Sequence, residues 1–266
     1  DNRFGSLYTS ASVVHREPLR ADLKESIKNG GKQKIHPERL FDYELGYKIS
    51  KAKYSFNANF YYMDYKDQMV QTGKLNDVGY KLMENVDKSY RYGLELSGAY
   101  LPVQWLRFDA NLTLSQNKIL DYTAYFDQYD TDWNYVGQVA EYHPETDISF
   151  SPNIISSGVI TYKPLDNLSM AFVGKYVGKQ YYDNTSNKTN RLDDYFVGNL
   201  VFSYNHQVKN LGELEFQFFV NNIFDKEYVA NAWTETYKFT DGSQEVYTGL
   251  YPQATRNFMT KISLKF

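Results

Sequence analysis

The sequence predicts an all-β protein, an antiparallel up-and-down transmembrane β-barrel, and three observations support this prediction. About ten segments alternate apolar and polar residues with a period of two, as strands do when one face meets lipid and the other a lumen. The connections between them alternate short and long, which is typical of a barrel with a periplasmic and an extracellular rim. Aromatic residues make up 17% of the chain, 26 Tyr and 17 Phe, enough to supply interfacial aromatic girdles.

Composition narrows the class of protein further. The 266 residues suffice for a large single domain or for part of a larger one. The chain has no cysteine, so it has no disulfide framework and no thiolate metal site. A net charge of −3 argues against nucleic acid as the main partner. The chain opens at Asp1 with neither an initiator Met nor a signal-peptide segment, so we expect a mature chain or a fragment.

The first part of the chain predicts three strands and a helix. Residues 4–14 are compatible with a strand. Residues 15–31 suit a short helix, because Leu19, Leu23 and Ile27 recur every fourth residue and Asn29-Gly30-Gly31 can end it. The strands 41–49 and 54–62 are joined so tightly that they predict an antiparallel hairpin.

The rest of the chain repeats the strand pattern. Further strands are expected at 92–100, 106–115, 154–162, 168–177, 196–204, 214–220 and 258–266. The short connections are 50–52, 101–104, 163–167 and 205–212; the long ones are 15–37, 70–80, 121–153, 183–195 and 224–250. A soluble β-sandwich or propeller is the alternative, because its core faces also alternate, but its loops would not sort so consistently.

Seven segments in order also resemble a known family. They are His15-Arg-Glu-Pro18, 35–47, 57–65, 85–97, 175–184, 220–228 and 251–266. Together they resemble the C-terminal part of the barrel of a TonB-dependent outer-membrane receptor, of the siderophore, cobalamin or haem type rather than the glycan-importer type. The resemblance implies a barrel of about 22 strands around a plug. Residues 1–266 would then be a single C-terminal portion with the last ten strands, and the plug domain and TonB-binding segment would be absent from this chain.

The resemblance implies a function without covalent chemistry and without a cofactor. Such a receptor lies in the outer membrane, binds a scarce ligand (an iron–siderophore, haem or cobalamin) at extracellular loops, and imports it with energy from TonB. The expected partners are outer-membrane lipid and lipopolysaccharide, TonB, and a small molecule such as a ferric siderophore. The alternative is a self-contained ten-stranded outer-membrane barrel acting as an enzyme or adhesin. The sequence has no G-x-S-x-G, H-E-x-x-H or Gly-rich phosphate loop, so we assign no catalytic residue.

Candidate ligand-binding residues come from two kinds of pattern, aromatic connections and a basic stripe; the aromatic connections are the loop 121–153 and the connection 224–250. The loop 121–153 interleaves aromatic rings with carboxylates, which suits an amphipathic ligand. The basic stripe of the predicted helix, Arg16, Arg20, Lys24 and Lys28, with Lys32 and Lys34 beyond it, would attract an anionic ligand. The candidates are Arg16, Arg20, Lys24, Tyr125, Tyr129, Trp133, Tyr181, Trp233 and Tyr237. The alternatives are that the rings pack the loop against its neighbours, and that the basic stripe meets lipopolysaccharide phosphates or is a solvated face.

Charged residues in the polar series of the strands form a third set. Their alternation with apolar residues predicts that they face the lumen. They are Asp42, Glu44, Arg91, Glu95, Arg107 and Asp109. The resemblance implies that they hold the plug by polar contacts. The acidic spacing in loop 121–153 does not match a calcium loop, so we expect a solvated acidic loop and assign no metal site.

Overall fold

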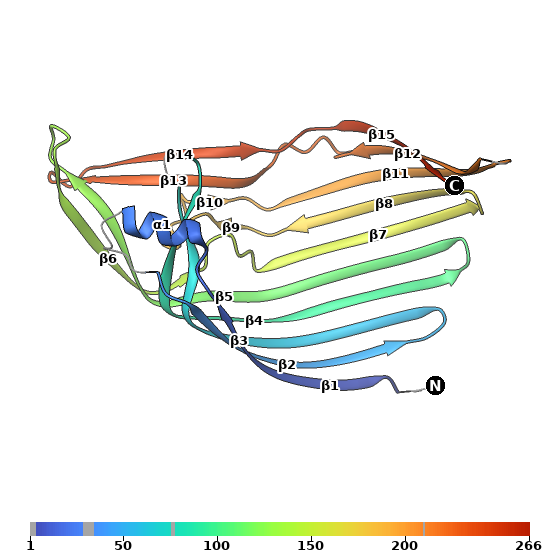
Figure 1. The fold of residues 1–266 in the computed structure, drawn as a ribbon, viewed down its shortest axis with the longest axis horizontal. Coiled ribbons are helices and arrows are strands. Elements are labelled where there is room, and N and C mark those ends of the chain that lie inside the picture. Colours follow the sequence, from blue (N-terminus) through green and yellow to red (C-terminus); the bar gives the residue numbers. More distant parts are fainter. Residues whose placement is uncertain (1–3, 29–34, 76–77, 210) are drawn as a thin grey trace.

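A computed structural model describes residues 4–28, 35–75, 78–209 and 211–266. Ten strands follow one another across a single antiparallel sheet in the order β1-β2-β3-β4-β5-β7-β8-β11-β12-β15 (Figure 1). Their bounds are β1 Ser6–Arg16, β2 Glu38–Ser50, β3 Tyr54–Leu75, β4 Lys81–Val103, β5 Leu106–Tyr129, β7 Ile154–Leu165, β8 Leu168–Val177, β11 Tyr195–Val208, β12 Gly212–Asn221 and β15 Asn257–Lys265. The up-and-down order confirms the predicted fold class. Within the described residues the sheet is not closed, and β1 and β15 are its edges.

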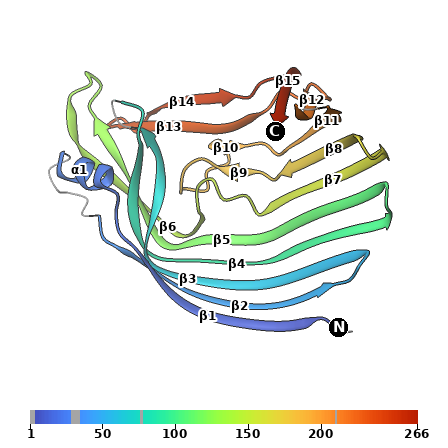
Figure 2. The same cartoon turned by 45° about the vertical axis from the view of Figure 1, so that its right-hand side comes forward.

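The two ends of the sheet differ. The short turns gather at one end, on the right in Figure 1, which we call the proximal end; the long connections gather at the other, the distal end. The strands are steeply curved toward the distal end, where several of them leave the plane of the sheet (Figure 2).

One face of the sheet is apolar from strand to strand. A single lateral row runs through Leu45, Phe60, Leu94, Leu114 and Ile154 on five neighbouring strands. Each of these side chains is exposed, from 37% at Leu94 to 52% at Leu45. A continuous exposed apolar band is rare on soluble monomers and is typical of the outward face of a transmembrane β-barrel.

The opposite face is polar and closely packed. Tyr8 of β1 lies over Gly46 of β2, and its hydroxyl donates to Asn59 Oδ1 at 3.2 Å. A Cβ atom at Gly46 would lie 2.0 Å from the Tyr8 ring, so only glycine permits this approach. Asn59 in turn donates to Glu44 Oε2 at 3.2 Å.

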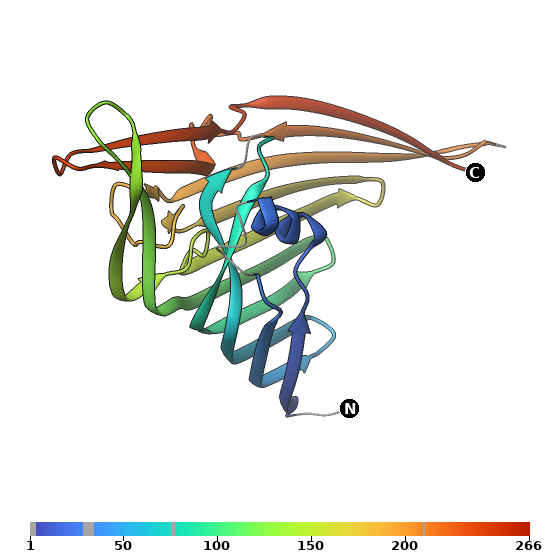
Figure 3. The ribbon, with the colours of Figure 1, turned by 60° about the vertical axis from the view of Figure 1, so that its left-hand side comes forward.

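Three of the predicted long connections, 70–80, 121–153 and 224–250, consist largely of strands, so the assignment of 121–153 as a loop was wrong. Three strands extend beyond the apolar band: β3 continues as far as Leu75, β4 begins already at Lys81, and β5 continues as far as Tyr129. The connection 121–153 also contains β6 (Tyr135–Asp147), and residues 224–252 contain β13 (Val229–Phe239) and β14 (Gln244–Pro252). Two short strands, β9 (Gln180–Tyr181) and β10 (Arg191–Leu192), lie just before and within 183–195. These extensions project past the sheet as hairpins (Figure 3). They lack the apolar–polar alternation because neither of their faces belongs to the apolar band.

The predicted helix is confirmed as α1, Arg20–Lys28. Asp22 Oδ2 accepts from the backbone N–H of Leu19 at 3.1 Å, which satisfies a donor at the start of the helix. The Asn29-Gly30-Gly31 terminator lies outside the described residues. The side chains of Leu23 and Ile27 are 43% and 75% exposed. Among the helical residues described here, none belongs to a segment long and apolar enough to cross a membrane.

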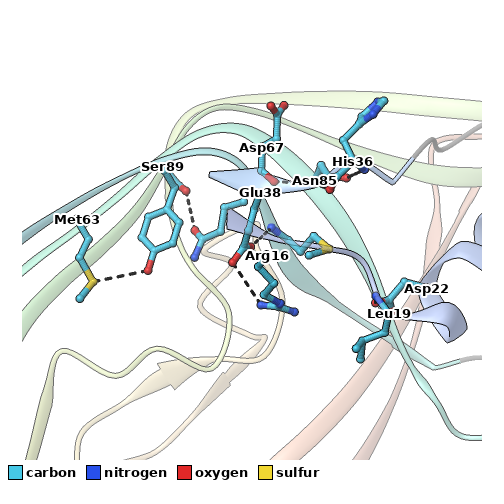
Figure 4. A network of polar contacts seen from close by, with 12 residues as sticks. Arg16, Leu19, Asp22, His36, Glu38, Met63, Asp67, Asn85 and Ser89 are labelled. Carbon is cyan, nitrogen blue, oxygen red and sulfur yellow. Dashed lines mark hydrogen bonds and ion pairs between the residues drawn. The ribbon is translucent and has the colours of Figure 1, made fainter. Parts of the chain in front are cut away.

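Polar contacts fasten the strands where they leave the sheet (Figure 4). Glu38 at the start of β2 accepts from the backbone N–H of Met69 at 2.8 Å and forms an ion pair with Arg16 at 3.5 Å. The Asn85 amide of β4 accepts from the backbone N–H of His36 at 2.7 Å and donates to the carbonyl of His36 at 3.0 Å. These hydrogen bonds and this ion pair hold the strands in place where the distal hairpins begin.

Candidate functional site

A cavity of about 850 Å³ lies at the distal end of the sheet. Five segments enclose it: α1, the β3–β4 extension, the β5–β6 hairpin, residues 183–185 and β13. Its aromatic lining is Tyr80, Tyr122, Tyr125, Phe126 and Tyr135. Its charged lining among the described residues consists of five carboxylates, Asp22, Glu84, Asp127, Asp183 and Glu235, with no Lys, Arg or His. Each carboxylate comes from a different segment, so the tertiary fold alone creates this acidic wall.

A buried network forms the deep side of the cavity. Asn184, 1% exposed, accepts from the backbone N–H of Ser149 at 2.9 Å and donates to the carbonyl of Gln71 at 2.9 Å. Tyr122 donates its hydroxyl to Glu84 Oε1 at 2.8 Å. Burial, with the Glu84 carboxylate beside it, raises the pKa of Tyr122 far above its ordinary value. The phenol therefore stays a hydrogen-bond donor at any physiological pH.

Asp183 is a buried carboxylate on the same wall, 6% exposed. It accepts from the Thr185 backbone N–H at 3.0 Å, from the Thr185 hydroxyl at 2.8 Å and from the Asn190 side-chain amide at 2.5 Å. Burial raises the pKa of Asp183, and these neutral donors and nearby His143 oppose the rise. The carboxylate is thus satisfied by hydrogen bonds from neutral groups on its protein side.

An aromatic cluster joins two hairpins beside the cavity. The Trp133 ring lies 5.6 Å from Tyr129, 5.8 Å from Tyr237 and 4.9 Å from Phe239, measured between ring centroids. The backbone N–H of Thr240 donates to the Tyr129 carbonyl at 2.9 Å. Burial and nearby Glu235 raise the pKa of Tyr237 to about 12. Three predicted ligand-binding residues, Tyr129, Trp133 and Tyr237, therefore contact one another. Ring contacts of this kind occur in packed loops, and the role of these residues in ligand binding stays a prediction.

The other aromatic candidates are separated from one another. Tyr125 lines the cavity and is 58% exposed. Tyr181 lies in β9, and Trp233 lies in β13 with its ring over Gly249 of β14. Of these three residues only Tyr125 belongs to the described lining of the cavity. The role of all three in ligand binding stays a prediction.

The basic candidates are not among the described lining residues of the cavity. Asp22 and Ser26 of α1 line the cavity, and Arg20 and Lys24 are each two positions from Asp22, about 200° around a helix. Arg16 pairs with Glu38. Among the described lining residues none of these three cations is present. Their binding of an anionic ligand or of lipopolysaccharide stays a prediction.

The six residues predicted to face the lumen lie on the polar face of the sheet. The register places Asp42 and Arg91 in one lateral row, joined through Met63. Arg91 donates to Asn117 Oδ1 and to the Ser151 hydroxyl, both at 3.1 Å. The remaining members are Glu44, Glu95, Arg107 and Asp109, of which the last two form an ion pair at 2.7 Å. Contact of this face with a plug stays a prediction.

Sequence reasoning missed the residues that make the cavity wall acidic. Asp22, Glu84, Asp183 and Glu235 stand in segments with no pattern that separates them from solvated surface charges. The one available signal was that Asp183 and Asn184 fall at the end of segment 175–184, which resembles the receptor family. Among the residues that the structure describes, no group of three or more His, Asp or Glu side chains could hold a metal ion.

A curved antiparallel sheet with one apolar face, one polar face and alternating short and long connections is part of the wall of an up-and-down β-barrel. Residues 2–223 match the family described as "TonB dependent receptor-like, beta-barrel". The chain belongs to this family. No protein of curated function matches the chain.

Solved structures with the same fold include receptors and transporters. The copper transporter OprC is 18% identical, with a TM-score of 0.65 over 98% of this chain and 37% of its own. The siderophore receptor PiuA from Acinetobacter baumannii is 17% identical, with a TM-score of 0.62 over 98% of this chain and 34% of its own. The ferric yersiniabactin uptake receptor FyuA from Yersinia pestis is 16% identical, with a TM-score of 0.61 over 98% and 35%. At such identities the likeness shows the fold alone. The chain spans about a third of the length of these structures.

Proposed function

We propose that this chain is the C-terminal barrel portion of an outer-membrane receptor that binds a small ligand at its extracellular end and imports it with energy from TonB. The observation that carries the proposal is the distal cavity, which five long-connection segments enclose above a barrel wall. Family membership and the printed functions of similar structures, metal and siderophore transport, support transport rather than catalysis. An iron–siderophore, haem or cobalamin is the candidate ligand.

The proposed setting follows from the two faces of the sheet. The apolar face would contact outer-membrane lipid, with lipopolysaccharide around the extracellular end. The polar face would contact a plug, because charged side chains such as Arg91 and Glu95 need polar partners inside a barrel. The free edges of β1 and β15 would pair with further strands of the same barrel, since unpaired backbone groups in lipid cost several kcal/mol each.

The test is an uptake measurement with the complete receptor gene in cells with and without TonB. Radioactive ferric siderophores, haem and cobalamin are supplied one at a time. The expected result is accumulation of one of them only when both TonB and the receptor are present. Uptake that is equal without TonB would contradict the proposal. A gene that encodes only a signal peptide directly before Asp1 would instead favour the self-contained barrel.

A further inference from the structure

The alternation of residues in β15 does not by itself fix which residues of β12 it pairs with. Its side chains form two series, one on each face of the sheet: Phe258, Thr260, Ile262 and Leu264, and Met259, Lys261, Ser263 and Lys265. A slip of two residues along β12 would keep both series on their own faces, because side chains alternate with a period of two. The pattern therefore sets the face of β15 but not its register.

The connection between β12 and β15 does not set the register either. A tight turn can do so, and only Asp166 and Asn167 lie between β7 and β8. Strands β12 and β15 are instead separated in sequence by the hairpin β13–β14, which lies on their distal side (Figure 1). Among the described residues β15 pairs with β12 alone. The register of this pair therefore has to be set by other contacts.

A buried amide joins the two ends of this connection. Asn222, 3% exposed, donates through Nδ2 to the Lys226 carbonyl at 2.9 Å and to the Ala254 carbonyl at 3.2 Å. Its Oδ1 accepts from the backbone N–H of Lys226 at 2.9 Å. Its own backbone N–H donates to Asn199 Oδ1 of β11 at 2.8 Å. One side chain and its backbone thus link β11, the end of β12 and the segment before β15.

Further contacts cross the same junction. Asp225 Oδ1 accepts from the backbone N–H of Arg256 at 2.8 Å, and Arg256 Nε donates to the Ile223 carbonyl at 3.2 Å. The Asn221 side-chain amide donates to Asn257 Oδ1 at 2.9 Å. A slip of β15 by two residues would move Arg256 and Asn257 by about 7 Å and break these contacts. We call this junction the clasp and define it as residues 221–226 and 254–257.

An aromatic ring attaches the clasp to the apolar face of the wall. Phe224 lies over Gly198 of β11, where a Cβ atom would come within 2.7 Å of the Phe224 ring. The ring centroids of Phe172 and Phe196 lie 6.3 Å and 6.0 Å from that of Phe224. The backbone N–H of Ile223 donates to the Gly198 carbonyl at 2.8 Å. The clasp is therefore fastened to β11, a strand that pairs on both sides within the wall.

We propose that the clasp is a register lock: it selects the pairing of β15 with β12 and fixes the base from which β13–β14 extends to the distal cavity. Strand β13 contributes Thr234, Glu235 and Thr236 to the cavity wall, so the same contacts position that part of the wall. The inference concerns assembly of the barrel wall, and it goes beyond the proposed function because it depends on neither a ligand nor TonB.

The test is disulfide crosslinking in the complete receptor after assembly in the outer membrane. The 266 residues contain no cysteine, so cysteine pairs can be introduced without competing thiols among them. Glu215→Cys with Ser263→Cys reports the observed register, because these residues are direct partners. Pairing Glu215→Cys with Lys261→Cys, or with Lys265→Cys, reports a slip of two residues in either direction. Such diagonal neighbours lie about 7–8 Å apart, beyond the reach of an unstrained disulfide.

Two substitutions open the clasp. Asn222 and Asp225 have positive φ angles of 51° and 54°, so the replacements are residues that tolerate this conformation. Asn222→Asp keeps the side-chain size but turns the donor to two carbonyls into an acceptor. Asp225→Gly removes the acceptor of the Arg256 N–H. Peptide mass spectrometry after oxidation should show slipped products in both variants, with their ratio to the observed-register product raised about fivefold in Asp225→Gly and further in Asn222→Asp.

Glu227→Ala is the matched control, because Glu227 is exposed in the same connection and lies outside the clasp. Its slipped products should stay at the level of the parent receptor. Asn221→Ala removes only the side-chain bond to Asn257 and should give the smallest rise. If Asn222→Asp does not reach the membrane, the two milder variants, at Asn221 and Asp225, decide the question. Unchanged register in the clasp variants that assemble, or an equal rise in Glu227→Ala, would overturn the proposal.

This outcome is separable from that of the uptake experiment. Register is measured without a ligand and without TonB. Slipped products in the clasp variants, together with TonB-independent uptake by the parent receptor, would reject the proposed function and keep the register lock. TonB-dependent uptake with an unchanged register in the clasp variants would do the reverse.

Discussion

In the wall of the barrel, neighbouring strands pair apolar residues with apolar residues in row after row. At the distal end, contacts instead join side chains from segments that are far apart in the sequence. Leu94 faces Phe60 and Leu114 in the wall, one row of many. At the distal end Asn184 reaches Gln71, 113 residues away, and Trp133 reaches Phe239. The wall is therefore tolerant of exchanges that keep its alternation. The distal end depends on individual contacts.

The largest expected effect comes from a charge in the apolar face of the wall. Leu112→Arg places a guanidinium in the middle of the apolar face, beside Leu96. Such a charge near the membrane midplane costs about 2–4 kcal/mol. We expect reduced assembly into the outer membrane and a lower free energy of unfolding, measured by denaturant titration in lipid vesicles.

The neighbouring residue supplies the control for this comparison. Thr113→Arg adds the same side chain on the polar face, where Thr113 faces Glu95. It should assemble close to normally. Equal losses in the two variants would show that the two faces of the wall are not chemically distinct.

The next effect concerns the buried network at the distal end. Asn184→Ala removes the acceptor of the Ser149 N–H and the donor to the Gln71 carbonyl. The Gln71 carbonyl keeps the Ser149 hydroxyl as a donor, but the buried Ser149 N–H loses its acceptor, which costs about 1–3 kcal/mol. We expect faster hydrogen exchange in residues 148–151 and 180–192, with the wall strands unchanged.

Asn187→Ala is the matched variant in the same segment. Asn187 is exposed, and its Oδ1 accepts from the backbone N–H and the hydroxyl of nearby Thr189. Its exchange should change little outside residues 187–190. Acceleration that spreads equally through the wall strands in Asn184→Ala would mean that the two regions unfold together.

A smaller effect is expected at the aromatic cluster. Trp133→Ala removes ring contacts with Tyr129, Tyr237 and Phe239, each worth roughly 0.5–1.5 kcal/mol. The tip of β13–β14 should then exchange faster. Trp133 has a positive φ of 63°, so Trp133→Gly should be less destabilising than Trp133→Ala, because glycine adopts this conformation without strain.

A third substitution tests whether ring contact matters. Tyr142→Ala removes a ring that is 62% exposed and outside the cluster. It should leave exchange at the β13–β14 tip unchanged. The same acceleration in Tyr142→Ala would assign the effect to β5–β6 generally rather than to the cluster.

The smallest effect is expected at the ion pair between Lys238 and Glu141. The Glu141 side chain is 42% exposed, so solvent screens the pair. A double-mutant cycle with Lys238→Met and Glu141→Gln should give a coupling free energy below about 1 kcal/mol. A coupling several times larger would show that charge, and not ring packing, joins the two hairpins.

The sequence by itself determined the wall. Because a strand exposes alternate residues to lipid, a period of two in residues such as Phe258, Ile262 and Leu264 is enough to predict strand, face and order. The short turns followed from the same pattern. The helix α1 was also predictable from the sequence, because Leu and Ile recur in it every fourth residue, whereas the neighbouring strands alternate with a period of two.

Only the tertiary structure decided the distal end. Neither face of the distal strands belongs to the apolar band, so no period of two identified β6, β13 or β14. Carboxylates such as Glu84, Asp183 and Glu235 are ordinary residues in the sequence and become one acidic wall only when five segments converge. The sequence also directed attention to the basic face of α1, yet helix orientation sets Asp22 toward the cavity. A contact between distant segments leaves no periodic trace, and this is the physical reason that the wall was predictable and the cavity was not.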